Sequence, residues 1–481
     1  MQPYEQIALV ITNILFVLSL GFYLITNLQW YNYKIERVVL KHHKPFWHVF
    51  YFIIPFMLYY TTGNYFLIFF YFAYLPALFI WHKRLDKKLV FTWRVKRYFI
   101  LLLALTLFGD FLCFIKHTCN HYGVFLPLAV AYIGSTIIEK YLFMIYKKEA
   151  KKKLKEDLEI VAITGSYGKT SIKNFTATLL AQKYVTYATP RSVNTLGGII
   201  KDINEDLPSD TQVYVVEAGA RERGDIYEIT TFIEPQRVVV GKVGAAHIEY
   251  FKTLENIIKT KLEIMATPRL QKAFIHCSVT DEEHEKVEFF CEDEIYNLEA
   301  TLDGVSFSLK INDEMVDFHS PHILGAFQAT NILAAIKVAL SFGLDIKTIQ
   351  KGVSKIQSVP HRLQKIEASG KIILDDGFNG NLDGMKEAIR LCSLHKGRKV
   401  IVTPGLVEST EELNKELIEH INGVFDTVIV TGKLNAKLFD THLKVDKKII
   451  LEDKSKLQDI LAEHTRSGDI ILFANDAPNF I

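Results

Sequence analysis

The chain has 481 residues with a formal net charge of +2, and 49% of its residues are hydrophobic. This length predicts about three domains, and the balanced charge without a strongly basic domain argues against a nucleic-acid-binding protein. The five cysteines (Cys113, Cys119, Cys277, Cys291 and Cys392) form no CxxC pair, so we expect free thiols in a reducing compartment. The hydrophobic excess lies before residue 147, which indicates a membrane region followed by a water-soluble part.

Residues 1–150 are predicted to form an N-terminal α-helical membrane region of about five spans. Single spans are expected at Ile7–Leu24, Tyr98–Ile115 and Val124–Phe143. The uncharged run Phe46–Ile80 is interrupted near Gly63, so we interpret it as two short spans joined by a hairpin. A cleaved signal peptide is the alternative for the first span alone, but the missing basic segment before it argues against cleavage.

The charges between the spans predict their orientation. Basic residues gather in Tyr33–Lys44 and His82–Arg97, and six lysines follow the last span between residues 147 and 155. Because basic segments remain on the cytoplasmic side, we expect the N-terminus outside and the chain after Phe143 in the cytoplasm. The last lysine run either binds anionic membrane lipid or only fixes this orientation.

Asp110 lies inside the fourth expected span, where a carboxylate is a functional candidate. No second ionisable residue accompanies it there. We therefore favour the simpler interpretation that Asp110 lies near a water-exposed end or pairs with a lysine.

The soluble part begins with a predicted phosphate-binding loop. Leu158–Thr164 has the composition of a buried strand, and Ile172, Phe175 and Leu179 recur at helical spacing. A glycine turn between a strand and a helix can bind ATP phosphates, with the lysine on the outer phosphates and the following hydroxyl on Mg²⁺. The expected nucleotide-binding residues are Gly165, Ser166, Tyr167, Gly168, Lys169 and Thr170. Only two residues separate the two glycines, whereas the common motif has four, and a bare Gly-Lys-Thr turn also occurs by coincidence.

Residues 151–357 are predicted to form a P-loop domain around a parallel sheet. The strand candidates are Gln212–Ala218, Arg237–Val243 and Ala273–Ser278, with a helix at Thr253–Met265. Ligands of such folds bind at the carboxyl ends of the strands, where Glu217, His247, Lys261 and Glu263 are expected. Glu217 and His247 are candidate metal ligands beside the loop, although singly they could be a helix cap and an ordinary loop residue.

Residues 358–481 are predicted to form a Rossmann-like α/β domain, preceded by a small-residue helix that opens near Leu324 and ends at Gly343. Its strand candidates are Lys371–Leu374, Lys399–Thr403, Thr427–Thr431, Lys448–Leu451 and Asp469–Phe473. The segment Asp375–Met385 places asparagines and aspartates among glycines after the first strand. It is either a loop that binds a polar ligand or a glycine-rich turn.

From Glu159 to the C-terminus, the order of motifs resembles the Mur ligases, the ATP-dependent amide-forming enzymes of peptidoglycan precursor synthesis. The motifs are TGSYGKT at 164–170, VEAG at 216–219, GAAH at 244–247, KLE at 261–263, NILAA at 331–335, PHR at 360–362 and DD at 375–376. The segment DDGFNGNLDGM is most similar to that of family members that add D-alanyl-D-alanine to UDP-N-acetylmuramoyl-tripeptide. These two molecules are the substrates that the resemblance implies.

The resemblance implies a reaction in which the acceptor carboxylate takes the γ-phosphoryl group of ATP, and the amine of D-alanyl-D-alanine attacks the acyl phosphate. ATP and Mg²⁺ would be required. The implied catalytic residues are Lys169, His247 and Lys261, and the implied Mg²⁺ ligands are Thr170, Glu217, His247 and a carbamylated Lys261. Further nucleotide contacts would come from Asn331, Arg362 and Asp376, and substrate contacts from Asn194, Asn379 and Asn381. The implied location is the bacterial inner membrane, with catalytic domains in the cytoplasm and other cell-wall enzymes as further partners.

The chain also departs from the family pattern. The usual His-Asn is Phe327-Gln328, the expected Lys-Gly-Ser near the C-terminus is Ala474-Asn475-Asp476, and the membrane region replaces the uridine-nucleotide-binding domain. Two alternatives therefore stay open. One is an amide ligase or amidase-type modifier of a lipid-linked muramoyl-peptide, and the other is a membrane transporter or scaffold with a regulatory nucleotide-binding domain.

Overall fold

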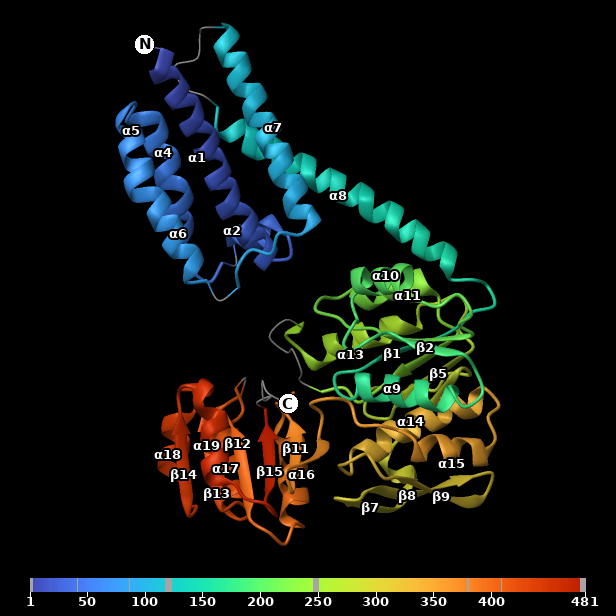
Figure 1. Cartoon of the computed structure of the whole chain (residues 1–481). Coiled ribbons are helices and arrows are strands. Elements are labelled where there is room, and N and C mark those ends of the chain that lie inside the picture. Colours follow the sequence, from blue (N-terminus) through green and yellow to red (C-terminus); the bar gives the residue numbers. More distant parts are fainter. Residues whose placement is uncertain are drawn as a thin grey trace. The chain divides into compact units, whose positions relative to one another are not determined.

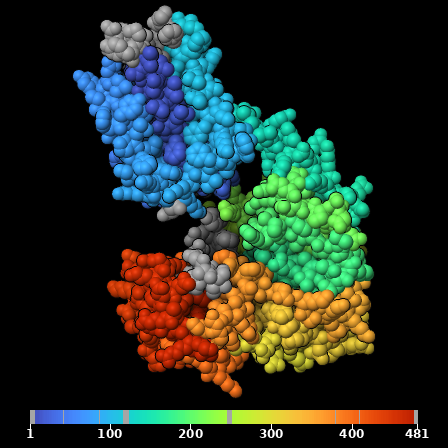
Figure 2. Space-filling model, in the orientation of Figure 1, coloured from blue at the N-terminus to red at the C-terminus, as the bar shows by residue number. Residues whose placement is uncertain are grey.

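The computed structural model describes residues 3–40, 42–85, 87–116, 123–244, 251–378, 380–407 and 409–475. The chain divides into two compact units, Met1–Lys147 and Lys148–Ile481. Figure 1 shows them as ribbons and Figure 2 with their side chains. The first unit has its own hydrophobic core, and the second has separate cores under each of its two larger sheets. The predicted boundary at residue 150 lies close to the division, and the one at 357 falls within the second unit.

The described part of the first unit is helical. Its α-helices are α1 (Pro3–Trp30), α2 (Ile35–Leu40), α3 (Phe46–His48), α4 (Ile54–Thr61), α5 (Tyr65–Phe69), α6 (Leu75–Lys83), α7 (Trp93–Lys116) and α8 (Phe125–Lys153), which continues into the second unit. Short π-helical turns at Val49–Ile53 and Phe70–Tyr74 join α3 to α4 and α5 to α6. The two apolar helices thus formed are separated by a turn at Gly63, where the sequence predicted a hairpin.

Three helices among the described residues are long and apolar enough to cross a membrane: Ile7–Trp30, Tyr65–Lys83 and Phe125–Lys153. The segment Phe46–Thr61 is a shorter apolar helix. The remaining expected span, Tyr98–Ile115, lies within α7. Length and composition therefore support three of the five expected spans.

Asp110 is buried in α7 and differs from its expected setting. Its Oδ1 accepts a 2.7 Å hydrogen bond from Asn13 Nδ2 of α1, and Asn13 Oδ1 accepts one of 2.9 Å from the Tyr59 hydroxyl. The expectation of a water-exposed position or a lysine partner is wrong, because an amide from a neighbouring helix satisfies this oxygen instead.

The second unit begins with a six-stranded parallel sheet in the order β2-β3-β1-β4-β5-β6. Its strands are β1 (Glu159–Thr164), β2 (Thr186–Ala188), β3 (Val213–Glu217), β4 (Arg237–Val240), β5 (Lys272–His276) and β6 (Val287–Phe290). Helices α9 (Lys169–Leu180), α14 (Gln328–Ser341) and α15 (Ile346–Ser354) cover one face, and α10 (Leu196–Glu205), α11 (Asp225–Ile233) and α13 (Leu254–Leu262) the other (Figure 1). Burial on both faces explains the valine and isoleucine runs, and the predicted parallel sheet is confirmed.

A three-stranded antiparallel sheet follows, formed by β7 (Ile295–Thr301), β8 (Gly304–Ile311) and β9 (Glu314–Ser320). The sequence pattern did not indicate this sheet. Phe307 and Phe318 of β8 and β9 are buried in the same core as Ile332 and Ile336 of α14. This small sheet therefore extends the core of the P-loop domain.

The C-terminal part contains a second six-stranded sheet in the order β10-β11-β15-β12-β13-β14. The strands are β10 (Gln364–Ala368), β11 (Lys371–Asp376), β12 (Lys399–Thr403), β13 (Thr427–Thr431), β14 (Lys447–Leu451) and β15 (Ile470–Ala474), of which β10 alone pairs antiparallel. Helices α16 (Leu382–Ser393), α17 (Glu411–Asn422) and α18 (Ala436–His442) pack into one core, and α19 (Leu457–His464) into another. The expected Rossmann-like alternation is present, and all five predicted strands are found.

Cys277 and Cys291 form a disulfide, so the expectation of free thiols is wrong for this pair. The two residues follow β5 and β6, which are neighbouring parallel strands. Adjacent strand ends therefore bring together cysteines that are 14 residues apart in sequence. Cys392 of α16 is a free, buried thiol.

Candidate active site

The predicted loop connects the carboxyl end of β1 to the start of α9. Gly168 adopts a φ of +75° as the N-cap of this helix, a conformation that favours glycine. A Cβ atom at Gly168 would also lie 2.4 Å from Asn331 Oδ1 of α14, so a side chain has no room there. The backbone amides of Ser166 and Tyr167 donate to the carbonyl of Lys242, at 3.0 and 3.2 Å. The strand, loop and helix are thus arranged as predicted, with Asn331 against the loop.

Lys169 folds back over the loop. Its Nζ donates to the carbonyl oxygens of Gly165 at 2.8 Å and Ser166 at 3.1 Å. Burial lowers the pKa of Lys169, Glu217 opposes this change, and Arg362 adds to it through charge repulsion. The ammonium group therefore lies where it can meet phosphate oxygens held by the loop, with Arg362 of the C-terminal part close enough to affect it.

Thr170 and Glu217 meet at the carboxyl end of the sheet. Thr170 Oγ1 donates a 2.9 Å hydrogen bond to Glu217 Oε2, and Asn194 Nδ2 donates to Glu217 Oε1 at 3.0 Å. The Glu217 side chain is buried and its backbone amide donates to Thr189 Oγ1 at 3.2 Å. A hydroxyl and a carboxylate beside a phosphate loop are suitable oxygen ligands for Mg²⁺.

Lys173 is a buried residue that the sequence analysis missed. It lies one turn after Lys169 on α9, and its Nζ donates at 2.6 Å to the carbonyl oxygens of both Thr189 and Arg191. The same Nζ lies 3.8 Å from Glu217 Oε2. The four-residue spacing from Lys169, on a face that also carries Ile172, was the available signal. Lys173 holds the 189–194 segment against Glu217 and partly balances the charge of this carboxylate.

Lys261 of α13 is buried near the same site. Burial lowers its pKa to about 7, and repulsion from Lys169 contributes in the same direction. Glu263 has a different role, because its carboxylate accepts hydrogen bonds from the backbone amides of Gly224 and Tyr227 at the start of α11. Glu263 is therefore a cap of that helix, while Lys261 remains close to Lys169 and Glu217 with a large neutral fraction.

Asp375 and Asp376 end β11 and hold the turn that carries Arg362. Asp376 Oδ1 accepts a 2.9 Å hydrogen bond from the amide of Leu363, and Asp375 Oδ2 lies 2.7 Å from His361 Nδ1. Both aspartates are buried. Asp376 thus contacts the backbone beside Arg362, which positions this arginine.

The predicted substrate residues differ in their positions. Asn194 lies beside Glu217, as described above. Asn381 caps α16, because its Oδ1 accepts a 2.8 Å hydrogen bond from the amide of Gly384. Asn379, expected to bind substrate, and His247, expected as a catalytic residue and metal ligand, lie outside the described residues.

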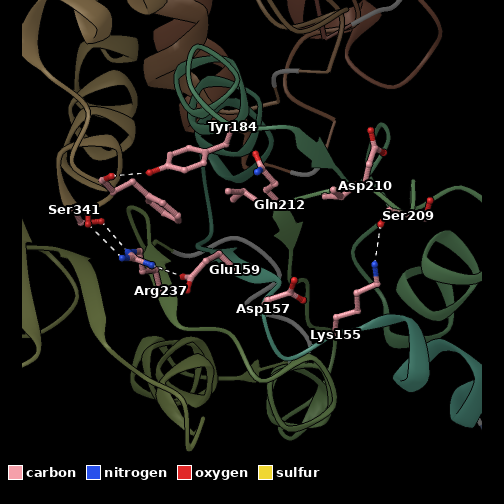
Figure 3. A pocket seen from close by; sticks show the side chains of 12 residues that line it. Lys155, Asp157, Glu159, Tyr184, Ser209, Asp210, Gln212, Arg237 and Ser341 are labelled. Carbon is pink, nitrogen blue, oxygen red and sulfur yellow. Dashed lines mark hydrogen bonds and ion pairs between the residues drawn. The ribbon is translucent and has the colours of Figure 1, made fainter.

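A pocket of about 560 Å³ lies at the opposite edge of the parallel sheet (Figure 3). Its lining includes Glu159 and Arg237, the first residues of β1 and β4, which form an ion pair. Parallel α/β sheets bind their ligands at the carboxyl ends of the strands. The loop, Thr170 and Glu217 are at that end, so this pocket is not the candidate nucleotide site.

Comparison with known proteins identifies the domain that carries these residues. The Mur ligase middle domain matches residues 163–339. The chain contains a Mur ligase middle domain. This domain includes the phosphate loop, Glu217, Lys261 and Asn331, and the match confirms the resemblance over residues 163–339.

Ligases of known name are similar to this chain at modest identity. The UDP-N-acetylmuramoyl-tripeptide D-alanyl-D-alanine ligase of Escherichia coli is 29% identical over 264 residues, which cover 52% of this chain and 58% of the relative. The Bacillus subtilis enzyme of the same name is 27% identical over 335 residues, or 65% of this chain and 72% of the relative. The match therefore spans little more than half of the Escherichia coli enzyme.

Solved structures agree with this family. The MurF ligase of Thermotoga maritima in complex with ADP has a TM-score of 0.59 and 25% identity to this chain, covering 69% of this chain and 80% of the MurF chain. The α/β architecture of the second unit is thus similar to that of this MurF ligase.

Proposed function

We propose that this chain is an ATP-dependent amide ligase that adds D-alanyl-D-alanine to UDP-N-acetylmuramoyl-tripeptide. The acceptor carboxylate attacks the γ-phosphorus of ATP to form an acyl phosphate and ADP. The amine of D-alanyl-D-alanine then attacks the acyl carbon, an amide bond forms, and phosphate leaves. Such transfers are catalysed chiefly by positioning and by neutralisation of charge.

The observation that carries this proposal is the contact between Thr170 and Glu217 beside the loop. It joins the residue after the phosphate-loop lysine to a buried carboxylate at the end of the neighbouring strand. Lys169 would hold the β- and γ-phosphates, with the backbone amides of the glycine turn around them. Asn331 would contact adenine, and Arg362, held by Asp376, would reach the nucleotide from the C-terminal domain.

The donor set at this point fits Mg²⁺. Thr170 and Glu217 offer neighbouring oxygens, and Lys173 and Asn194 compensate the buried carboxylate. When bound there, the ion would supply charge neutralisation for the phosphates. His247 and a carbamylated Lys261 are the proposed residues for a second ion.

Lys261 has the chemistry that carbamylation requires. Its neutral amine can attack CO₂, which forms a carbamate and releases a proton. The lowered pKa, about 7, supplies the neutral amine near physiological pH. A carbamate would also replace a cation near Lys169 by an anion, which removes the repulsion between these two lysines.

The first unit is proposed to be a multi-pass anchor in the bacterial inner membrane, with the catalytic domains in the cytoplasm. Its surface exposes large apolar side chains, among them Phe72, Ile100 and Leu126 with 81%, 67% and 69% of their area accessible. Helices that expose large apolar side chains in this way favour a lipid environment. Phe46–Thr61 and α7 would supply the fourth and fifth spans.

This unit also favours a second candidate function, in which the acceptor is the lipid-linked form of the muramoyl-peptide. Ligation assays on the purified full-length chain in detergent would distinguish the two candidate functions. Equal amounts of UDP-N-acetylmuramoyl-tripeptide and of its undecaprenyl-linked counterpart would be supplied with D-alanyl-D-alanine and ATP. The leading proposal expects amide formation on the soluble nucleotide; formation on the undecaprenyl-linked acceptor alone would replace it by the second candidate.

A further inference from the structure

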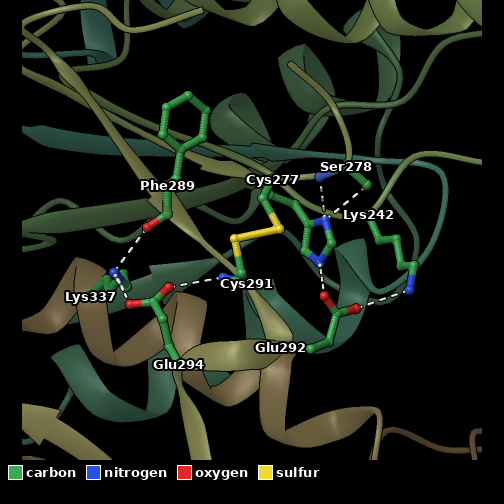
Figure 4. The surroundings of a disulfide bond; sticks show 9 residues. Lys242, Cys277, Ser278, Phe289, Cys291, Glu292, Glu294 and Lys337 are labelled. Carbon is green, nitrogen blue, oxygen red and sulfur yellow. Dashed lines mark hydrogen bonds and ion pairs between the residues drawn. A yellow bond between two sulfur atoms is a disulfide. The ribbon is translucent and has the colours of Figure 1, made fainter. Parts of the chain in front are cut away.

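His276, Cys277, Cys291 and Glu292 lie together where β5 and β6 end, at the same edge of the parallel sheet as the phosphate loop. His276 pairs in register with Phe290 across these parallel strands, and Cys277 N donates to the carbonyl of Phe290 at 3.1 Å. The ligand atoms of His276, Cys277 and Glu292 all lie within 4.8 Å of one another. Figure 4 shows the disulfide beside Glu292 and Lys242.

The imidazole of His276 is directed at this cluster. The residue is 1% exposed, and its Nδ1 lies 2.8 Å from Ser278 Oγ. Nδ1 also accepts a 3.1 Å hydrogen bond from the backbone amide of Ser278, and Nε2 lies 3.2 Å from Glu292 Oε2 as an ion pair. His276 Nε2 and Glu292 Oε2 therefore face each other already, as two ligands of one metal ion would.

We propose that reduction of the Cys277–Cys291 disulfide creates a Zn²⁺ site formed by His276 Nε2, the two cysteine thiolates and the Glu292 carboxylate. Two molecules of a thiol reductant cleave the S–S bond, giving two cysteine thiols and one oxidised disulfide of the reductant. Metal binding then displaces the two thiol protons. One imidazole, two thiolates and one carboxylate are a donor set that Zn²⁺ accepts with tetrahedral geometry.

The spacing and the charges fit this ion. Bond lengths of about 2.0–2.3 Å place tetrahedral ligand atoms about 3.3–3.8 Å apart. The ligand atoms of His276, Cys277 and Glu292, within 4.8 Å of one another, need to approach by about 1 Å, and the two sulfurs separate once the disulfide is reduced. Metal binding at Nε2 shifts the ring proton to Nδ1, where Ser278 Oγ, 2.8 Å away, can accept it. The two thiolates and Glu292 carry three negative charges against the two positive charges of Zn²⁺, and Lys242, whose Nζ lies 2.9 Å from Glu292 Oε1, balances the remainder.

The state of the cysteine pair therefore decides whether the ion binds. In the disulfide both sulfurs are consumed and only His276 and Glu292 remain as ligands. Cys277 is exposed, so both a reductant and a metal ion can reach it. In a reducing compartment an accessible disulfide opens, which makes the four-ligand form the working state there.

The test uses Co²⁺ as a spectroscopic substitute for Zn²⁺ in the purified full-length chain. Protein reduced with a phosphine, which does not itself supply thiols, should bind about one Co²⁺ per chain at this site, with intense visible bands of tetrahedral coordination and a thiolate-to-metal charge-transfer band. Added Zn²⁺ should bleach these bands. Protein kept in the disulfide form should show neither band. Co²⁺ at the oxygen ligands of the nucleotide site would give no thiolate band.

Substitutions locate the ion. The double variant Cys277→Ser/Cys291→Ser should lose the charge-transfer band, and Glu292→Gln, a surface change that leaves the fold intact, should weaken Co²⁺ binding by at least about tenfold. Cys392→Ser and Asp293→Asn, a buried thiol elsewhere and the neighbouring exposed carboxylate, are matched controls that should retain the bands. Absence of the bands in reduced wild-type protein, or their persistence in the double cysteine variant, would overturn the proposal.

Discussion

Thr170 donates a 2.9 Å hydrogen bond to Glu217, which joins the first turn of α9 to the end of β3. The register of β1 against β3 pairs Ile163 with Glu217, so this carboxylate lies beside the strand that leads into the loop. The contact is a direct consequence of parallel strand order. It places an oxygen pair for a divalent ion next to the lysine proposed to hold ATP phosphates.

Replacement of Lys169 by alanine should abolish phosphoryl transfer. Loss of a preorganised positive charge at transferring phosphates lowers kcat by about 10²–10³-fold. The measurement is ATP-dependent product formation by the full-length chain, with membrane insertion checked by fractionation. Lys201→Ala, at an exposed position of α10, is the control and should behave as wild type. Loss of insertion or of expression in Lys169→Ala would mean that this lysine is structural.

Replacement of Glu217 by glutamine should raise the Mg²⁺ concentration needed for half-maximal activity by at least about tenfold. A neutral amide keeps the size of the side chain but is a weaker ligand for a hard cation. The matched control is Glu228→Gln, an exposed carboxylate on α11. Titration of activity with Mg²⁺ at saturating ATP gives the comparison, and an unchanged Mg²⁺ requirement would exclude Glu217 as a ligand.

The pH dependence of carbamylation should follow the lowered pKa of Lys261. With a pKa of about 7, compared with an ordinary 10.5, the neutral amine rises from about a tenth at pH 6 to about nine tenths at pH 8. Bicarbonate should therefore stimulate activity increasingly over this range, and ¹³C-bicarbonate should give a carbamate carbonyl signal in NMR spectra. Lys261→Ala should lose both effects, whereas Lys259→Ala, at an exposed position of the same helix, should keep them. A carbamate signal that persists in Lys261→Ala would contradict the assignment.

Replacement of Lys173 by methionine should loosen the 189–194 segment. The change removes two hydrogen bonds from a buried ammonium to the carbonyls of Thr189 and Arg191, a loss on the order of 3 kcal/mol. Hydrogen exchange of the amides in this segment should accelerate about a hundredfold if they exchange by local opening. The control, Lys183→Met, removes an exposed lysine that donates to Gly343. Equal exchange in wild type and Lys173→Met would show that the segment is held in another way.

The sequence predicted the sheets well because parallel strands buried on both faces are runs of branched apolar residues. Arg237–Val240 and Thr427–Thr431 are such runs, and both regions were predicted to be strands. The sheet β7-β8-β9 was missed because β7 is mostly exposed and its strands lack such runs. Pairing of strand ends, as for Cys277 and Cys291, depends on sheet order and has no local signal in the sequence.

The candidate site was predictable where a motif fixes the backbone. The loop from Gly165 to Thr170 is such a case, because the strand and the helix that fix it directly flank it in the sequence. The roles of Asn381 and Glu263 were harder to predict, because an asparagine or glutamate in a polar segment can serve as a helix cap as well as a ligand. Which role it takes depends on the backbone amides that tertiary packing brings near.

The most direct test of the proposed reaction is product formation by the purified full-length chain. Mass spectrometry would follow UDP-N-acetylmuramoyl-tripeptide supplied with D-alanyl-D-alanine, ATP and Mg²⁺, while phosphate release is measured in parallel. The proposal predicts the UDP-N-acetylmuramoyl-pentapeptide and stoichiometric phosphate only when both substrates are present. Phosphate release without either substrate, or no pentapeptide with both present, would contradict it.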